Sequence, residues 1–179
     1  MNKYNDLIIK NTEFENIIKD IICNETVLQM LKYRQHYDTT CFDHCMNVAY
    51  YSYLICRKYN LDYVSAARAG MLHDLFLYDW REKKADNRKG LHAFTHPKTA
   101  FFNASKIFCL TQKEQDIILK HMWPLTIYFP RYIESLIVSF VDKYCAIEES
   151  FHAYSRNRRI RKMERFVYLF LSFFAINIL

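Results

Sequence analysis

The dipeptide His73–Asp74 places an imidazole beside a carboxylate at the end of an otherwise apolar segment, Ala69–Phe76. A buried charge without a partner costs several kcal/mol, so such groups either pair with each other or hold a cation. A His–Asp pair alone is a weak signal, because the same dipeptide occurs by chance in many proteins. Taken by itself, the dipeptide leaves an ion pair and a metal site both open.

Four more potential ligands stand where a packed core would prefer none. His44 lies within the apolar segment 42–49, and Asp142 lies within another, 137–144. His121 ends an apolar helical pattern, and His96 precedes Pro97 at an expected helix start. A core filled by chance would not repeat this arrangement over five elements, so the pattern indicates one shared polar site.

These residues resemble the signature of the HD-domain metal-dependent phosphohydrolases. That signature is an isolated His, a His–Asp dipeptide and a late Asp, and members with two metals add two histidines before the late Asp. The resemblance covers roughly residues 36–150 and implies an all-α helical fold and a set of metal ligands. By order and setting, the ligands that it implies are His44, His73, Asp74, His96, His121 and Asp142.

The resemblance further implies that Asp74 bridges two ions and activates a water, with the other ligands divided between the ions. Histidine and carboxylate ligands suit Fe, Mn, Co, Ni or Zn better than Ca. Two such ions clamp a phosphoryl group and supply a metal-bound hydroxide as the nucleophile. The implied enzyme is a metal-dependent hydrolase of phosphate esters, a phosphomonoesterase or phosphodiesterase acting on a nucleotide or a related small molecule. In a single-metal alternative, His96 and His121 bind the substrate instead.

Several nearby residues are candidates for contact with the substrate. Lys143, Lys98 and Arg68 could neutralise phosphate oxygens, Lys143 as a catalytic residue, although each could equally be an ordinary surface cation. His92 and His96 lie four residues apart, and either could supply the ligand. The Thr95–His96–Pro97 setting favours His96, which leaves His92 to meet the substrate phosphate.

The scarcity of glycine and proline favours long helices to position these residues. The 179 residues include two glycines and three prolines. Two glycines exclude a GxGxxG turn and a P-loop, and so few turn-forming residues argue against an all-β fold. We therefore predict an all-α, single-domain helical bundle. Gly70, three residues before His73, could let two helices approach closely.

The expected helices follow from apolar spacing and capping signals. Asp62 is an expected N-cap, and Thr111 with Glu114 forms an expected capping box. Two irregular stretches, 77–95 and 123–129, separate the later helices. We predict helices at about 12–33 (interrupted near Asn24), 41–59, 63–76, 97–108, 111–122, 130–151 and 156–178. N-terminal helices (1–35) and a C-terminal basic and apolar helix (153–179) should flank the metal-binding core (36–152).

Composition also bears on compartment and partners. Six cysteines without a CxxC pair, and no signal-peptide pattern, predict reduced thiols and a cytoplasmic protein. The net charge is +6, and a basic run at 156–162 precedes an apolar segment at 166–179 that is too short to span a membrane alone. We expect a small phosphorylated partner and no nucleic acid, while an oligomer remains open. The alternatives are an HD-type diiron oxygenase, or a metal- or nucleotide-binding protein whose basic C-terminal helix serves assembly or membrane contact.

Overall fold

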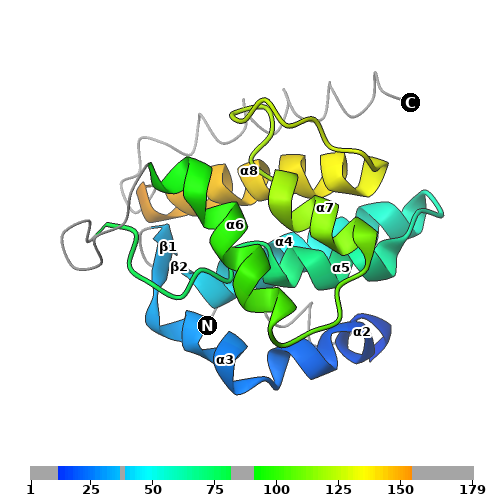
Figure 1. Cartoon of the computed structure of the whole chain (residues 1–179), viewed down its shortest axis with the longest axis horizontal. Coiled ribbons are helices and arrows are strands. Elements are labelled where there is room, and N and C mark those ends of the chain that lie inside the picture. The colour runs from blue at the N-terminus through cyan, green and yellow to red at the C-terminus, as the bar shows by residue number, and fades with distance from the viewer. Residues whose placement is uncertain (1–11, 37–38, 82–90, 155–179) are drawn as a thin grey trace.

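The computed structural model describes residues 12–36, 39–81 and 91–154, which form a helical bundle with one short pair of strands (Figure 1). This architecture confirms the predicted all-α class. The elements are α2 (Thr12–Ile22), α3 (Glu25–Leu28), the 3₁₀ helix η1 (Gln29–Lys32), β1 (Arg34–His36), β2 (Thr39–Thr40), α4 (Cys41–Lys58), α5 (Tyr63–Leu72), α6 (His92–Ser105), α7 (Gln112–Lys120) and α8 (Ile133–Tyr154).

Helix α4 is central, because it packs against both α5 and α8. Helix α7 closes the bundle against α5 and α8, α6 lies on α7, and α2 covers α5. A Cβ atom added at Gly70 would lie 2.9 Å from the Cα of Ala49, so the absence of a side chain there permits the close approach of α4 and α5. This agrees with the role expected for Gly70.

Side-chain caps begin several of these helices. Asp62 accepts a hydrogen bond from the backbone N–H of Ser65 at 3.0 Å. The side chain of Thr111 accepts from the backbone of Glu114, whose carboxylate accepts in return from the backbone of Thr111. Both caps were predicted from the sequence and are confirmed. Asn24, where an interruption was expected, caps α3.

Helix α5 ends four residues earlier than predicted, at Leu72 instead of Phe76. The chain then turns, and Leu77 adopts a positive φ of 55°. Side chains from other helices satisfy the carbonyl groups of this turn: the Cys41 thiol donates to the Asp74 carbonyl at 3.3 Å and Asn103 donates to the Leu75 carbonyl at 2.9 Å. The His73–Asp74 pair therefore lies in a turn at the end of α5.

Two other helix starts differ from the prediction. Helix α6 begins at His92, so Pro97 lies inside it. Proline lacks an N–H, and inside a helix it loses the bond to the carbonyl four residues earlier and crowds that carbonyl with its ring. Helix α8 begins at Ile133, three residues after Pro130. The antiparallel pair of β1 and β2 was not predicted, because strands of three and two residues leave no periodic pattern.

The predicted helix at 156–178, with the basic run and the apolar segment, lies outside the described residues. Within the described parts of the chain, none of the helices combines the length and the apolar character needed to cross a membrane.

Candidate metal centre

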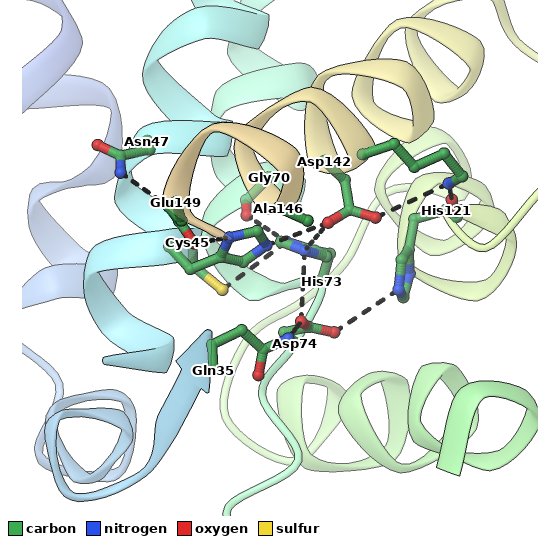
Figure 2. Close-up of polar contacts among 12 residues, drawn as sticks. Gln35, Cys45, Asn47, Gly70, His73, Asp74, His121, Asp142, Ala146 and Glu149 are labelled. Carbon is green, nitrogen blue, oxygen red and sulfur yellow. Dashed lines mark hydrogen bonds and ion pairs between the residues drawn. The ribbon is translucent and has the colours of Figure 1, made fainter. Parts of the chain in front are cut away.

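All six residues expected as ligands converge in the middle of the bundle. They come from α4, the turn after α5, α6, the end of α7 and α8, and each is at most 8% exposed. Figure 2 shows His73, Asp74, His121 and Asp142 facing one another from these elements. The ligand atoms form two groups, each within 4.8 Å: His44, His73 and Asp142 make up the first group, and His73, Asp74 and His121 the second.

Three of the histidines are oriented by backbone carbonyl groups. Nδ1 of His73 donates to the Gly70 carbonyl at 2.7 Å, Nδ1 of His96 to the His92 carbonyl at 2.9 Å, and Nδ1 of His121 to the Ile118 carbonyl at 2.9 Å. A carbonyl oxygen only accepts, so the proton sits on Nδ1 and the Nε2 lone pair is available as a ligand.

The Nε2 atoms of His96 and His121 face each other at 2.8 Å. Two lone pairs at this distance repel unless the nitrogens share a proton or bind the same cation. His96 also approaches Asp74, with its Nε2 3.2 Å from Oδ1. His96 therefore adjoins the second group.

His44 is held by side chains on both of its nitrogens. Nε2 lies 3.0 Å from Oδ1 of Asp142, and Nδ1 lies 3.0 Å from Oε2 of Glu149. The other oxygen of Glu149 accepts a hydrogen bond from the Asn47 amide at 3.2 Å. Glu149 thus links His44 to a second residue of α4, Asn47.

Asp74 faces the other ligands with both carboxylate oxygens. Oδ1 lies 3.6 Å from Nε2 of His121, and Oδ2 lies 3.6 Å from Nε2 of His73. The Gln35 amide from β1 donates to Oδ2 and fixes the orientation of the carboxylate. Nε2 of His73 and Oδ1 of Asp74 are buried without a hydrogen-bond partner among the described residues. Unpaired buried acceptor atoms of this kind suit coordination to a metal ion.

The charges of the centre shift the pKa of its members in opposite directions. Burial alone would lower the pKa of His44, but Glu149 and Asp142 outweigh burial and raise the pKa well above the ordinary value. Burial and the electrostatic influence of the neighbouring His73 and His96 rings lower the pKa of His121 to about 3. Burial raises the pKa of Asp74, yet the neighbouring histidines outweigh it and the net shift is downward. The carboxylates of Asp74 and Asp142, whose pKa values are both lowered, thus stay ionised and attract either protons or metal cations.

Two buried thiols border the centre without joining its ligands. Sγ of Cys45 lies 3.7 Å from Nδ1 of His73, and Cys41 donates to the Asp74 backbone. Burial raises the pKa of both thiols, which keeps them protonated at neutral pH. Neither thiol is a member of the two clustered groups, so the donor set of these groups consists of nitrogen and oxygen.

The residues expected to meet substrate fall into different settings. Lys143 is beside the centre, with Nζ 3.8 Å from Oδ2 of Asp142. Its ammonium group also donates to the carbonyls of His121 and Ser139 and to the Ser139 hydroxyl. With these acceptors engaged, Lys143 fastens α8 to the end of α7.

His92 lies at the edge of the centre, where its ring stacks on His96 with centroids 4.6 Å apart and on Trp80 at 5.6 Å. Lys98 is exposed on α6. Arg68 is directed elsewhere: its nitrogens bind Asp20, Glu114 and the Ile17 carbonyl. We therefore correct the expectation for Arg68, which joins α5 to α2 and α7.

Sequence reasoning missed three residues that support the ligands: Gln35, Asn47 and Glu149. Glu149 follows Asp142 by seven residues, or two helical turns, so helical periodicity could have placed it on the same face of α8. Gln35 carried no comparable signal, because its position depends on the unpredicted β1–β2 pair.

The donor set fits divalent transition metals, since it combines imidazole nitrogens with carboxylate oxygens and leaves buried ligand atoms unpaired. A family model described as "HD domain" matches residues 41–147, well over half of the chain, and the match includes all six clustered residues. No curated protein and no solved structure gives a significant match. The fold, the ordered ligand set and this match together show that the chain belongs to the HD-domain family, a superfamily of metal-dependent hydrolases.

Proposed function

We propose that the chain is a phosphohydrolase, a phosphomonoesterase or phosphodiesterase that acts on a nucleotide or a related small phosphorylated molecule. The observation that carries the proposal is the pair of buried ligand groups that share His73, with the Asp74 carboxylate facing both His73 and His121. The Nε2 lone pair of His73 can bind only one ion, so it is the two oxygens of Asp74 that suit this arrangement to two divalent ions, of the class Fe, Mn, Co, Ni or Zn.

Each residue of the centre has a definable task in this proposal. Bound ions would supply Lewis acidity toward a phosphoryl oxygen and acidify a water that becomes the nucleophile. His44, His73, His96, His121 and Asp142 present lone pairs from rings and carboxylates already oriented by hydrogen bonds. Asp74 is held by Gln35 so that its two oxygens face different histidines, which suits a bridging role.

The surroundings of His96 support a nucleotide as the substrate class. Half-buried Trp80 and Tyr78 adjoin His92, and His92 adjoins His96. The guanidinium of Arg81 lies 5.4 Å from the Trp80 ring centre and donates to the Gln35 carbonyl. Aromatic side chains and a cation beside a metal centre suit the base and the phosphate of a nucleotide.

The test combines metal analysis with a substrate screen. The purified protein, loaded with Mn, Fe, Co or Ni, should hydrolyse a member of a panel of phosphorylated nucleotides and dinucleotides. Asp74→Ala should lose both metal and hydrolysis, because the substitution removes the carboxylate that faces both groups. Asp20→Ala, which removes a carboxylate that belongs to α2, is the control and should retain both metal and hydrolysis.

Two results would contradict the proposal. The first is an Asp74→Ala variant that hydrolyses phosphate esters without metal. The second is a metal-loaded protein that leaves every phosphate ester intact and consumes dioxygen, which would indicate oxygenase chemistry instead.

A further inference from the structure

His44 differs from the other histidines of the centre in the partner of its Nδ1 atom. His73, His96 and His121 each donate to a backbone carbonyl three or four residues earlier in the chain. His44 is instead 3.0 Å from the carboxylate of Glu149, 105 positions away in sequence. The orientation of His44 therefore depends on a charged side chain from another helix.

Glu149 is itself firmly held. It is 9% exposed, and both of its oxygens have partners on α4, namely His44 and Asn47. On α8 it lies two turns beyond Asp142, the residue that contacts the opposite nitrogen of His44. The imidazole of His44 thus lies between two carboxylates of one helix, with Asp142 at Nε2 and Glu149 at Nδ1.

We propose that Glu149 is a positioning residue that sets the affinity of the first group, His44, His73 and Asp142, for its metal ion. The inference rests on the proposed metal site, and it assigns Glu149 no contact with metal or substrate. A carboxylate that accepts the Nδ1 proton fixes the ring and raises the basicity of Nε2, and loss of such a partner typically weakens metal affinity about 10- to 100-fold. The effect stays within the first group, because His96 and His121 take their orientation from carbonyls of their own helices.

A purely structural role makes a different prediction. If Glu149 only tied α8 to α4, its removal would lower the melting temperature and loosen both groups together. Glu149→Gln separates the two roles, because a glutamine carbonyl can still accept the Nδ1 proton but carries no charge. Its hydrogen bond would then resemble the carbonyl bonds of the other three histidines.

The experiment is a cobalt(II) titration of the full chain after chelation, followed by visible absorbance and calorimetry. The wild type should bind two ions. Glu149→Gln should fold with a near-normal melting temperature and weaken one binding phase about tenfold, and Glu149→Ala should weaken the same phase by up to about 100-fold. Glu148→Gln, the same change one residue earlier on α8, is the matched control and should leave both phases unchanged.

Each other outcome overturns a specific part of the argument. Equal weakening of both phases, or a lower melting temperature with unchanged affinities, assigns Glu149 a structural role only. Unchanged binding in both Glu149 variants refutes the inference but leaves the proposed function intact. A wild-type chain that takes up no cobalt refutes the proposed function and this inference together.

Discussion

The two ligand groups share His73 but are built in different ways. In the first group, carboxylates surround His44, and the contacts join α4 to α8 across 98 and 105 positions of sequence. In the second, His121 and the adjoining His96 are fixed by carbonyls within one helical turn. One half of the centre therefore depends on the packing of two helices, whereas the other is set largely by local backbone. The two halves also differ in the pKa of a histidine: carboxylates outweigh burial and raise the pKa of His44, while burial and the neighbouring imidazoles lower that of His121.

The largest effect should come from removing one ligand from either half. His44→Ala and His121→Ala should each leave about one ion per chain, because each removes an imidazole from one group only. Loss of one ion forfeits several kcal/mol of transition-state stabilisation, so activity should fall on the order of 10³-fold in both variants. Metal analysis and steady-state kinetics measure the two quantities.

His92→Gln is the control for metal content, because His92 belongs to neither group among the described residues. It should keep two ions. If His121→Ala kept two ions while His44→Ala lost both, the division of the centre into two halves would be wrong.

The six residues that the sequence singled out do lie together in the structure, and several of them could be recognised because they interrupt apolar segments. His44 and Asp142 stand out among hydrophobic neighbours, and their helices follow from periodicity and caps. Glu149 did not stand out, since Glu148 and Ser150 flank it and its role arises only when α8 packs on α4. Arg68 is the opposite case, because the sequence made it a candidate for substrate contact whereas the structure directs its side chain away from the centre. It is close to His73 in sequence, but five helical residues rotate a side chain by about 140°, toward another face of the bundle.

A smaller effect should appear in the pH dependence of metal binding to the two halves. The pKa of His44 is raised well above its ordinary value of 6.5, whereas that of His121 is lowered to about 3. An ion that enters the first group displaces the His44 proton, so the metal affinity of this group should fall as the pH decreases. For each pH unit, its affinity should fall about tenfold more than the affinity of the second group. Cobalt titrations between pH 6 and 8 measure both slopes.

The raised pKa of His44 also determines how the stability of the metal-free protein changes with pH. Because the folded pKa of His44 is raised, its contribution to stability is fully present below pH 6.5 and is lost as the pH rises through the folded pKa. Histidine NMR signals recorded during a pH titration report the protonation of each ring. Equal slopes for both binding phases, or a His44 ring that is neutral at pH 6, would contradict the contrast between the halves.

The smallest effect on catalysis should come from Arg68→Met, which changes the scaffold that both halves share. The substitution should lower the free energy of unfolding by about 1–2 kcal/mol. The ion pair with Asp20 contributes little, because Asp20 is more than half exposed and solvent screens the charges. The contact with Glu114 contributes more, because the Glu114 side chain is buried. The kcat and KM should stay within about twofold, because the guanidinium binds α2 and α7 and not the centre. Chemical denaturation and steady-state kinetics test the two parts separately.

Lys98→Met is the informative counterpart, since Lys98 is exposed on α6 two positions from His96. Its removal should change stability by less than about 0.5 kcal/mol, as expected for a surface side chain. If Lys98 meets the substrate phosphate as the sequence suggested, KM should rise while kcat and both cobalt affinities stay constant, because the ammonium would contribute to binding without orienting a ligand. A rise of KM in Arg68→Met with none in Lys98→Met would reverse the assignment and place the phosphate on the α5 side of the centre, away from the half that contains His96.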